Sequence, residues 1–306
     1  MKKTKIAGVL LALGLAAAEL LVQLSGIIDM PLYQADNQLG YIPAPNQSGA
    51  FLHSRHYRFN EYSMGSAAFE PDPRRFNLLL VGDSIVLGGN PINHSERLGP
   101  QLEKISGWQV WPVSAGSWAL QNELAYLRKH PDVLGRVDAV AIVLNSGDFG
   151  EPSSWVSPLT HPLERPFPAL FYVFKKYALA SRPPFEPKPE LRVSLRDWRA
   201  DLRDFSNSFD KPVYIFMYPG LDELHDPVKM NEQLNSRIPE LQAQLGSSAR
   251  VFKVADLPDW KESYYRDGVH PTAEGNAAFS RIIIRNICKE KLEKVACPVD
   301  DKPLSF

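Results

Sequence analysis

The sequence predicts an α/β protein: a three-layer, doubly wound sheet, mainly parallel, preceded by one N-terminal hydrophobic helix. Three observations carry this prediction. Short apolar runs alternate with helix-like stretches from residue 76 onward, as in repeated βαβ units. The 306 residues, of which 44% are hydrophobic, suffice for one sizeable core with appendages. The N-terminus holds a lysine cluster followed by a long apolar run.

The N-terminal segment, residues 1–29, has two interpretations. Lysines among residues 2–5 precede an apolar run from Ile6 to Ile28, which is long enough to cross a bilayer as an uncleaved anchor. A cleaved signal peptide would instead use Ala16–Ala18 as its small-residue site. Glu19 opposes insertion by roughly 2.5–3.5 kcal/mol, but the apolar character continues past it, which favours the anchor. In both cases the lysines stay in the cytoplasm, so we expect a membrane-anchored domain in the periplasm or outside the cell, secreted if the N-terminus is cleaved.

Residues 30–75 are rich in Asn, Pro, Ser and aromatic side chains, and we interpret them as a linker and lead-in segment. Residues 76–290 then form the expected domain, followed by a C-terminal tail over 291–306. The expected strands are Leu78–Val81, Val110–Val113, Ala139–Leu144, Val213–Tyr218 and Val251–Val254. The expected helices are Ser95–Ile105, Leu120–Lys129, Leu191–Phe205, Met230–Leu245 and Thr272–Cys288. In such sheets ligands bind at the carboxyl ends of the strands.

The alternation is interrupted by residues 151–190, which hold nine of the 26 prolines. An aromatic run from Phe167 to Phe174 is followed by Lys175 and Lys176. Such a segment fits an amphipathic helix lying near a membrane or over the site. An ordinary insertion packed on the domain is the simpler alternative, and the sequence slightly favours it.

The candidate nucleophile is Ser84, which lies close behind the first strand of the domain. A serine hydroxyl is a poor nucleophile until a base takes its proton. Asp267 and His270 offer that base in the loop before the last helix, whose N-cap we expect at Thr272. Their spacing lets Asp267 bond one imidazole nitrogen while the other faces Ser84. Taken singly, Ser84 is more simply a helix cap and His270 a surface histidine; the combination favours catalysis.

Four short sequence motifs, which we call blocks, occur in a characteristic order along the chain. They are Gly82-Asp83-Ser84, Ser114-Ala115-Gly116-Ser117, Asn145-Ser146-Gly147-Asp148 and Asp267-Gly268-Val269-His270. With this order and spacing, residues 76–288 resemble the SGNH/GDSL hydrolase superfamily, and Asn60–Gly65 resembles a lead-in segment of its membrane-anchored, extracytoplasmic members. The resemblance implies a flavodoxin-like SGNH hydrolase fold with Ser84, Asp267 and His270 as catalytic residues. It also implies an oxyanion hole from Ser84, Gly116 and Asn145.

The third block departs from the family pattern, which usually ends in Asn-Asp, the asparagine being an oxyanion donor. Here Gly147 precedes Asp148, and the nearest asparagine is Asn145. Either Asn145 supplies the donor from a shifted backbone, another group does, or the hole is incomplete. A lost donor typically costs about 10²–10³ in turnover. A plain turn residue remains an equal interpretation of Asn145.

The two cysteines do not form a zinc-binding pattern, and we expect neither a metal nor a cofactor. Cys288 and Cys297 either pair, which an oxidising compartment would allow, or stay as free thiols. The net charge of −1 shows no basic surplus of the kind that nucleic-acid binders carry. The expected partners are therefore a small-molecule or glycan ester, the membrane through the N-terminal segment, and a membrane-bound acyltransferase.

Three functions follow from these residues. The first is a serine esterase or deacylase acting on an O-acyl ester of an envelope or other extracytoplasmic substrate. The second is an O-acyltransferase that uses the same triad to move an acyl group onto a polysaccharide. The third, suggested by Gly147, is a non-catalytic SGNH-like binding protein.

Overall fold

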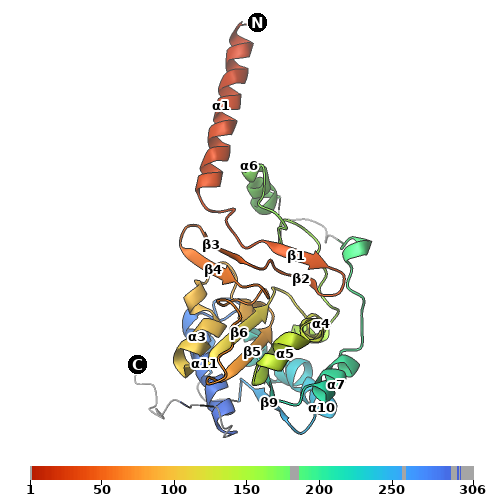
Figure 1. Cartoon of the computed structure of the whole chain (residues 1–306). Helices are drawn as coiled ribbons and strands as arrows, with labels where there is room; N and C mark the ends of the chain where they lie inside the picture. Colours follow the sequence, from red (N-terminus) through yellow and green to blue (C-terminus); the bar gives the residue numbers. More distant parts are fainter. Residues whose placement is uncertain (1, 180–185, 257–259, 291–294, 296, 298–306) are drawn as a thin grey trace.

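The computed structural model describes the chain except residues 1, 180–185, 257–259, 291–294, 296 and 298–306. Its centre is a five-stranded sheet with the strand order β6-β5-β7-β8-β9, and every neighbouring pair is parallel (Figure 1). The strands are β5 (Asn77–Gly82), β6 (Gln109–Ser114), β7 (Ala139–Leu144), β8 (Val213–Met217) and β9 (Ala249–Lys253). The predicted doubly wound α/β fold, with one N-terminal apolar helix, is thus confirmed.

Burial on both faces explains why these strands are apolar runs and not alternating ones. All residues of β5, β7 and β8 are buried. Along β5 the side chains alternate between two cores: Leu79 and Val81 join the cluster under α4 and α7, whereas Leu78 and Leu80 join the cluster under α3 and α11. The sheet is therefore the middle of three layers.

The helices cover the two faces of the sheet. One face carries α4 (Leu120–Lys129), α5 (Pro131–Arg136), α7 (Trp198–Ser208) and α10 (Arg237–Gln244). The other carries α2 (Ser84–Leu87), α3 (Leu98–Ser106) and α11 (Ala273–Cys288). Shorter helices are α8 (Leu221–His225) and α9 (Pro227–Lys229). The predicted N-cap of the last helix is confirmed, since Thr272 Oγ1 accepts the Gly275 N–H at 3.0 Å.

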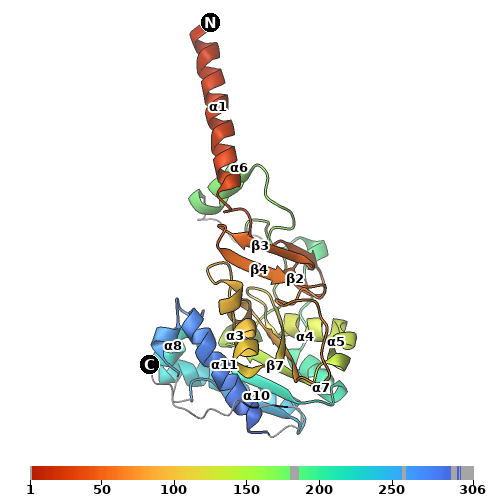
Figure 2. The same ribbon diagram turned by 60° about the vertical axis from the view of Figure 1, so that its left-hand side comes forward.

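Residues 30–75 form two antiparallel hairpins followed by an irregular segment. The hairpins are β1 (Tyr33–Asp36) with β2 (Gly40–Pro43), and β3 (Gln47–Phe51) with β4 (Arg55–Phe59). They lie between the N-terminal helix and the central sheet (Figures 1 and 2). They are attached to the domain by buried bonds, for example from Trp118 Nε1 to the Tyr41 carbonyl at 2.7 Å.

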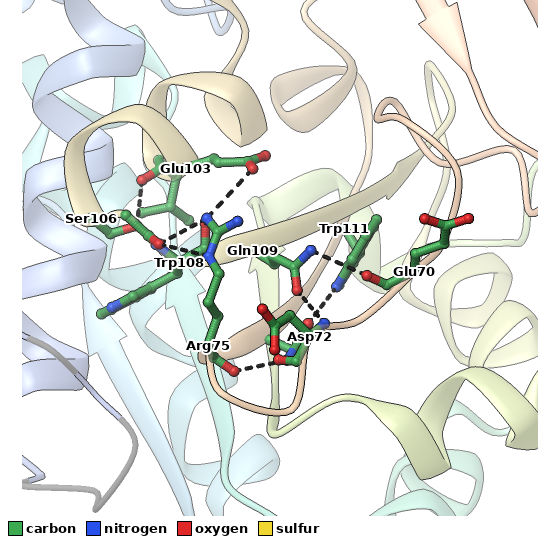
Figure 3. Close-up of polar contacts among 11 residues, drawn as sticks. Glu70, Asp72, Arg75, Glu103, Ser106, Trp108, Gln109 and Trp111 are labelled. Atoms are coloured by element: carbon green, nitrogen blue, oxygen red, sulfur yellow. Dashed lines mark hydrogen bonds and ion pairs between the residues drawn. The ribbon is translucent and has the colours of Figure 1, made fainter.

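The lead-in segment is fastened to the edge of the sheet by polar contacts (Figure 3). Gln109 at the start of β6 accepts the Asp72 N–H and donates to the Glu70 carbonyl. The Arg75 guanidinium donates to the carbonyls of Gly107 and Trp108, which precede β6. These bonds tie the segment to the amino end of an edge strand, the end opposite the expected site.

The N-terminal helix α1 (Lys2–Leu24) projects from the body of the protein (Figures 1 and 2). Within its stretch Lys3–Leu24, an 18-residue window has a mean hydropathy of 2.0, and the helix is long and apolar enough to cross a membrane. Beside its inner end lies α6 (Ala169–Val173), continued by a π-helical turn over Phe174–Ala178, both from the 151–190 insertion. At the other terminus Cys288 is joined to Cys297 by a disulfide, which settles the alternative left open by the sequence.

Candidate active site

Ser84 lies at the first position of α2, directly beyond the carboxyl end of β5. Asp83 caps this short helix, because its Oδ1 accepts the Ile85 N–H at 2.8 Å. Gly82 permits the tight passage from strand to helix: a Cβ there would lie 2.5 Å from Val86 Cγ2. The backbone thus presents the Ser84 side chain at the edge of the sheet where ligands are expected.

His270 and Asp267 meet Ser84 from the loop before α11. The His270 Nε2 lies 2.9 Å from Ser84 Oγ, and its Nδ1 lies 2.9 and 3.0 Å from the two carboxylate oxygens of Asp267. Asp267 Oδ1 also accepts the backbone N–H groups of Val269 and His270 at 3.0 and 2.8 Å. Although 186 residues separate Ser84 from His270, the structure brings the three predicted residues into one chain of hydrogen bonds.

Asp267 is held in its ionised form. Partial burial alone would raise its pKa, but the backbone N–H groups of His270 and Val269 and the imidazole lower this pKa to about 2. A carboxylate at Nδ1 fixes the tautomer that leaves Nε2 free to accept a proton. This Nε2 is the ring nitrogen that lies next to Ser84 Oγ.

Gly116, the predicted backbone donor of the second block, is the second residue after the end of β6. The Tyr41 hydroxyl donates to its carbonyl at 2.6 Å, which fixes the peptide from the side of the β1–β2 hairpin. Outside its chain neighbours, a Cβ built on Gly116 would meet no described atom within 4 Å. The space beside this peptide is thus open to a ligand.

Asn145 lies just past the end of β7, and its side chain is bonded to the turn that carries Ser84. Its Nδ2 donates to Asp83 Oδ2 at 3.0 Å, and its Oδ1 accepts the Gly147 N–H at 2.7 Å. An amide NH₂ has two hydrogens; one bonds Asp83, and the second can reach another acceptor, for which the Asp148 carboxyl competes because it also interacts with this side chain. Gly147, where the family pattern has asparagine, supplies the N–H that orients the Asn145 side chain.

Sequence reasoning missed a group of buried carboxyls behind Ser84. Asp83, Glu123 on α4 and Asp148 are 5%, 0% and 3% exposed. Burial, with the charge of Asp83 as a further cause, holds the pKa values of Glu123 and Asp148 well above their usual range. Burial likewise raises the pKa of Asp83, against the lowering effects of the Ile85 N–H and the His270 charge.

Glu123 stands apart in this group, because both of its carboxyl oxygens are buried without a hydrogen-bond partner among the described residues. Asp148, by contrast, accepts the Asn145 N–H at 2.7 Å. A glutamate inside a predicted amphipathic helix gives no signal in the sequence of its burial. Only the packing of α4 beneath the strand ends reveals it.

Comparison with known proteins finds solved structures of similar shape, whereas no family model and no curated protein matches the chain. A carbohydrate esterase family 2 enzyme from Corynascus thermopiles (Myceliophthora fergusii) is 15% identical with a TM-score of 0.45, over 73% of this chain and 68% of that one. A salicylyl-acyltransferase from a tetracycline biosynthetic pathway is 13% identical with a TM-score of 0.44, over 72% and 56%. A lipolytic protein of the G-D-S-L family from Veillonella parvula is 11% identical with a TM-score of 0.40, over 69% and 98%.

Proposed function

We propose that this protein is a serine ester hydrolase in which Ser84 is the nucleophile, His270 the general base and Asp267 the residue that orients the base. The observation that carries the proposal is the continuous chain of contacts from Ser84 Oγ through both ring nitrogens of His270 to Asp267, each within 3.0 Å. This distance lies within the hydrogen-bond reach expected between a nucleophile and its base.

The reaction proceeds through an acyl-enzyme. Ser84 Oγ attacks the ester carbonyl while His270 Nε2 takes its proton, and the imidazolium then gives that proton to the leaving alcohol. Water, deprotonated in turn by His270, attacks the acyl-serine. The imidazolium then returns this proton to Ser84 Oγ as its bond to the acyl carbon breaks, and the acid is released. Asp267 remains ionised throughout and stabilises the imidazolium.

The negative oxygen of each tetrahedral intermediate needs donors aimed at it. The backbone N–H groups of Ser84 and Gly116 serve this purpose, and the second N–H of Asn145 Nδ2 completes the set. The bond from Asn145 to Asp83 supports this role, since it ties the amide to the residue before the nucleophile. Asn145 thereby takes the place of the asparagine that Gly147 replaces.

The substrate we propose is an O-acyl ester of an envelope glycan or another extracytoplasmic molecule. Two observations support the location: the exposed apolar helix α1 behind its lysines, and the Cys288–Cys297 disulfide, which suits an oxidising compartment. An acceptor hydroxyl on a polysaccharide in place of water would make the same site an O-acyltransferase, served by a membrane-bound acyltransferase that supplies the acyl group.

The test uses the full-length chain in detergent. A fluorophosphonate probe and p-nitrophenyl acetate should react with the wild type and with Ser95→Ala, which removes an exposed serine hydroxyl, but not with Ser84→Ala. Labelling at another residue would contradict Ser84 as the nucleophile, and no labelling at all would favour the binding-protein alternative. A polysaccharide that speeds release of labelled acetate from the acyl-enzyme, and becomes acetylated, would identify a transferase.

A further inference from the structure

One face of the α6 segment, which we define as residues 167–179, is both apolar and exposed. Phe167, Phe171 and Phe174 are 81%, 53% and 51% exposed, and Tyr177 is 56% exposed. Phe171 in α6 and Phe174 at the start of the following helical turn are three residues apart and so are neighbours on the helix surface, while Phe167 precedes the helix. Four exposed aromatic side chains within this one segment are of the kind that marks an interaction surface.

The opposite face of the segment is packed against the root of the N-terminal helix. Ala169 and Tyr172 are buried in a small cluster with Ile28 and Met30. The Tyr172 hydroxyl also donates to the Leu159 carbonyl at 3.2 Å. The segment is therefore held in place from within, and its outward aromatic face is a fixed feature of the fold.

Glu19 joins this segment to the anchor. Its two carboxylate oxygens accept the N–H groups of Ala169 and Leu170, each at 2.8 Å, and Gln23 Nε2 donates to Oε1 at 2.7 Å. These are the first two N–H groups of α6, which the helix itself leaves unsatisfied. The one acidic residue in the apolar run of α1 is thus the N-terminal cap of a second helix.

The position of Glu19 sets the depth at which α6 lies. Glu19 is 16 residues beyond Lys3, or about 24 Å along a helix that rises about 1.5 Å per residue. The hydrocarbon core of a bilayer is about 30 Å thick. With Lys3 at the cytoplasmic boundary, Glu19 and the start of α6 lie about 6 Å inside the opposite boundary, which is within the depth of about 5–10 Å at which interfacial helices are buried.

We propose that the outer face of the α6 segment is a second membrane contact, inserted into the interface of the outer leaflet beside α1 and clamped there by Glu19. The proposal rests on α1 spanning the membrane. Continuity of the patch with α1 favours lipid as the occupant, and so does its composition. Phenylalanine is typical of the apolar face of interfacial helices and tyrosine of the membrane interface, and Lys175, 4.4 Å from the centre of the Phe171 ring, suits anionic headgroups.

The second contact orients the domain as well as attaching it. A single helix would let the domain rotate about its stalk, whereas two contacts fix which face meets the membrane. That face carries the hairpins, since they lie between α1 and the sheet (Figure 2). Through the Tyr41 bond to Gly116, the same hairpins border the candidate active site. The site is thereby held at a set distance from the lipid surface.

Site-directed fluorescence on the full-length chain tests this arrangement. An environment-sensitive NBD label is placed on one introduced cysteine at a time, the native pair being protected by its disulfide, in vesicles of phosphatidylcholine and phosphatidylglycerol. The positions are Leu11→Cys in α1, Phe171→Cys and Phe174→Cys in the α6 segment, and Val228→Cys, a 62% exposed control on α9. Lipids carrying a nitroxide near the headgroup should quench the labels at 171 and 174 several-fold more than the label at 228. Lipids carrying the nitroxide deep in the acyl chain should likewise quench the label at 11, which lies near the bilayer centre if α1 spans the membrane.

Each other outcome overturns the proposal in its own way. Quenching of the label at 11 without quenching at 171 or 174 would show that α1 enters the membrane and that the α6 segment does not. No quenching at 11 would show that α1 itself does not span the membrane. A blue-shifted but unquenched label at 171, varying with the protein-to-lipid ratio, assigns the patch to a second copy of the chain. Glu19→Leu should keep the quenching at 11 and lose it at 174; an unchanged signal at 174 would refute the clamp.

Discussion

Replacing Asn145 by alanine tests whether the oxyanion hole is complete despite Gly147. The change removes the Nδ2 group that bonds Asp83 at 3.0 Å and, in our proposal, directs its second hydrogen at the oxyanion. One donor of this kind contributes about 2.7–4 kcal/mol to transition-state stabilisation, which corresponds to about 10²–10³ in kcat. KM should change little, because the ground-state carbonyl needs this donor less than the oxyanion does.

The assay is the kcat for p-nitrophenyl acetate, alongside the rate of fluorophosphonate labelling, for the full-length enzyme in detergent. Ser146→Ala is the matched control, since it alters the next residue in the same turn and leaves Asn145 in place. The Ile85 N–H still bonds Asp83 in the Asn145→Ala variant, so the cap of α2 is retained. A kcat within a few-fold of wild type, with thermal unfolding unchanged, would refute Asn145 as a donor.

Three further predictions follow from the charges and the disulfide. Asp267→Asn should lower kcat by about 10⁴, since an amide permits the wrong imidazole tautomer; activity close to wild type would contradict the assigned role. Glu123→Gln should flatten the pH dependence of stability. Burial raises the pKa of Glu123 in the folded protein above its ordinary 4.5, so the folded state keeps a proton that the unfolded chain releases. The unfolding free energy therefore falls as the pH rises above 4.5, by up to about 1.4 kcal/mol per pH unit. Urea titrations from acidic to neutral pH measure this slope, and an equal slope in the variant would assign it elsewhere. Cys288 and Cys297 should resist alkylation until the disulfide is reduced. Cys297→Ser should lower the unfolding free energy by about 2–3 kcal/mol, as expected for a loop of this length, and urea unfolding measures this loss. Alkylation of both thiols without reductant would contradict the disulfide.

The central sheet could be predicted because burial on both faces leaves a direct mark on the sequence. β7 was expected at Ala139–Leu144 and has these bounds, and all six of its residues are apolar. Helix ends were harder to predict. A helix was expected from Leu191, but α7 begins at Trp198, where Asp197 accepts the Arg199 N–H as its cap. The helix expected over Met230–Leu245 is divided into a π-helical turn and α10.

The candidate site could be predicted to the extent that its residues are local in sequence. Asp267 and His270 are three residues apart, and Ser84 directly follows a strand, so order and spacing revealed them. The roles of Tyr41 and Glu123 depend on contacts across 75 residues of sequence and on burial beneath the strand ends, respectively. No periodicity records either kind of relation. The two hairpins of residues 30–75 were hidden for the same reason, since their short strands are only partly apolar.

Glu19 shows how a residue that conflicts with one interpretation can carry another. As a carboxylate in an apolar run it opposes insertion, by roughly 2.5–3.5 kcal/mol at the centre of a span. The structure offsets that cost with three hydrogen bonds, two of them from N–H groups of α6 that would otherwise lack partners at the membrane surface. Each partner thus satisfies a polar group that the other exposes. The pairing explains why an acidic residue is tolerated there and why an aromatic helix 150 residues away lies beside it.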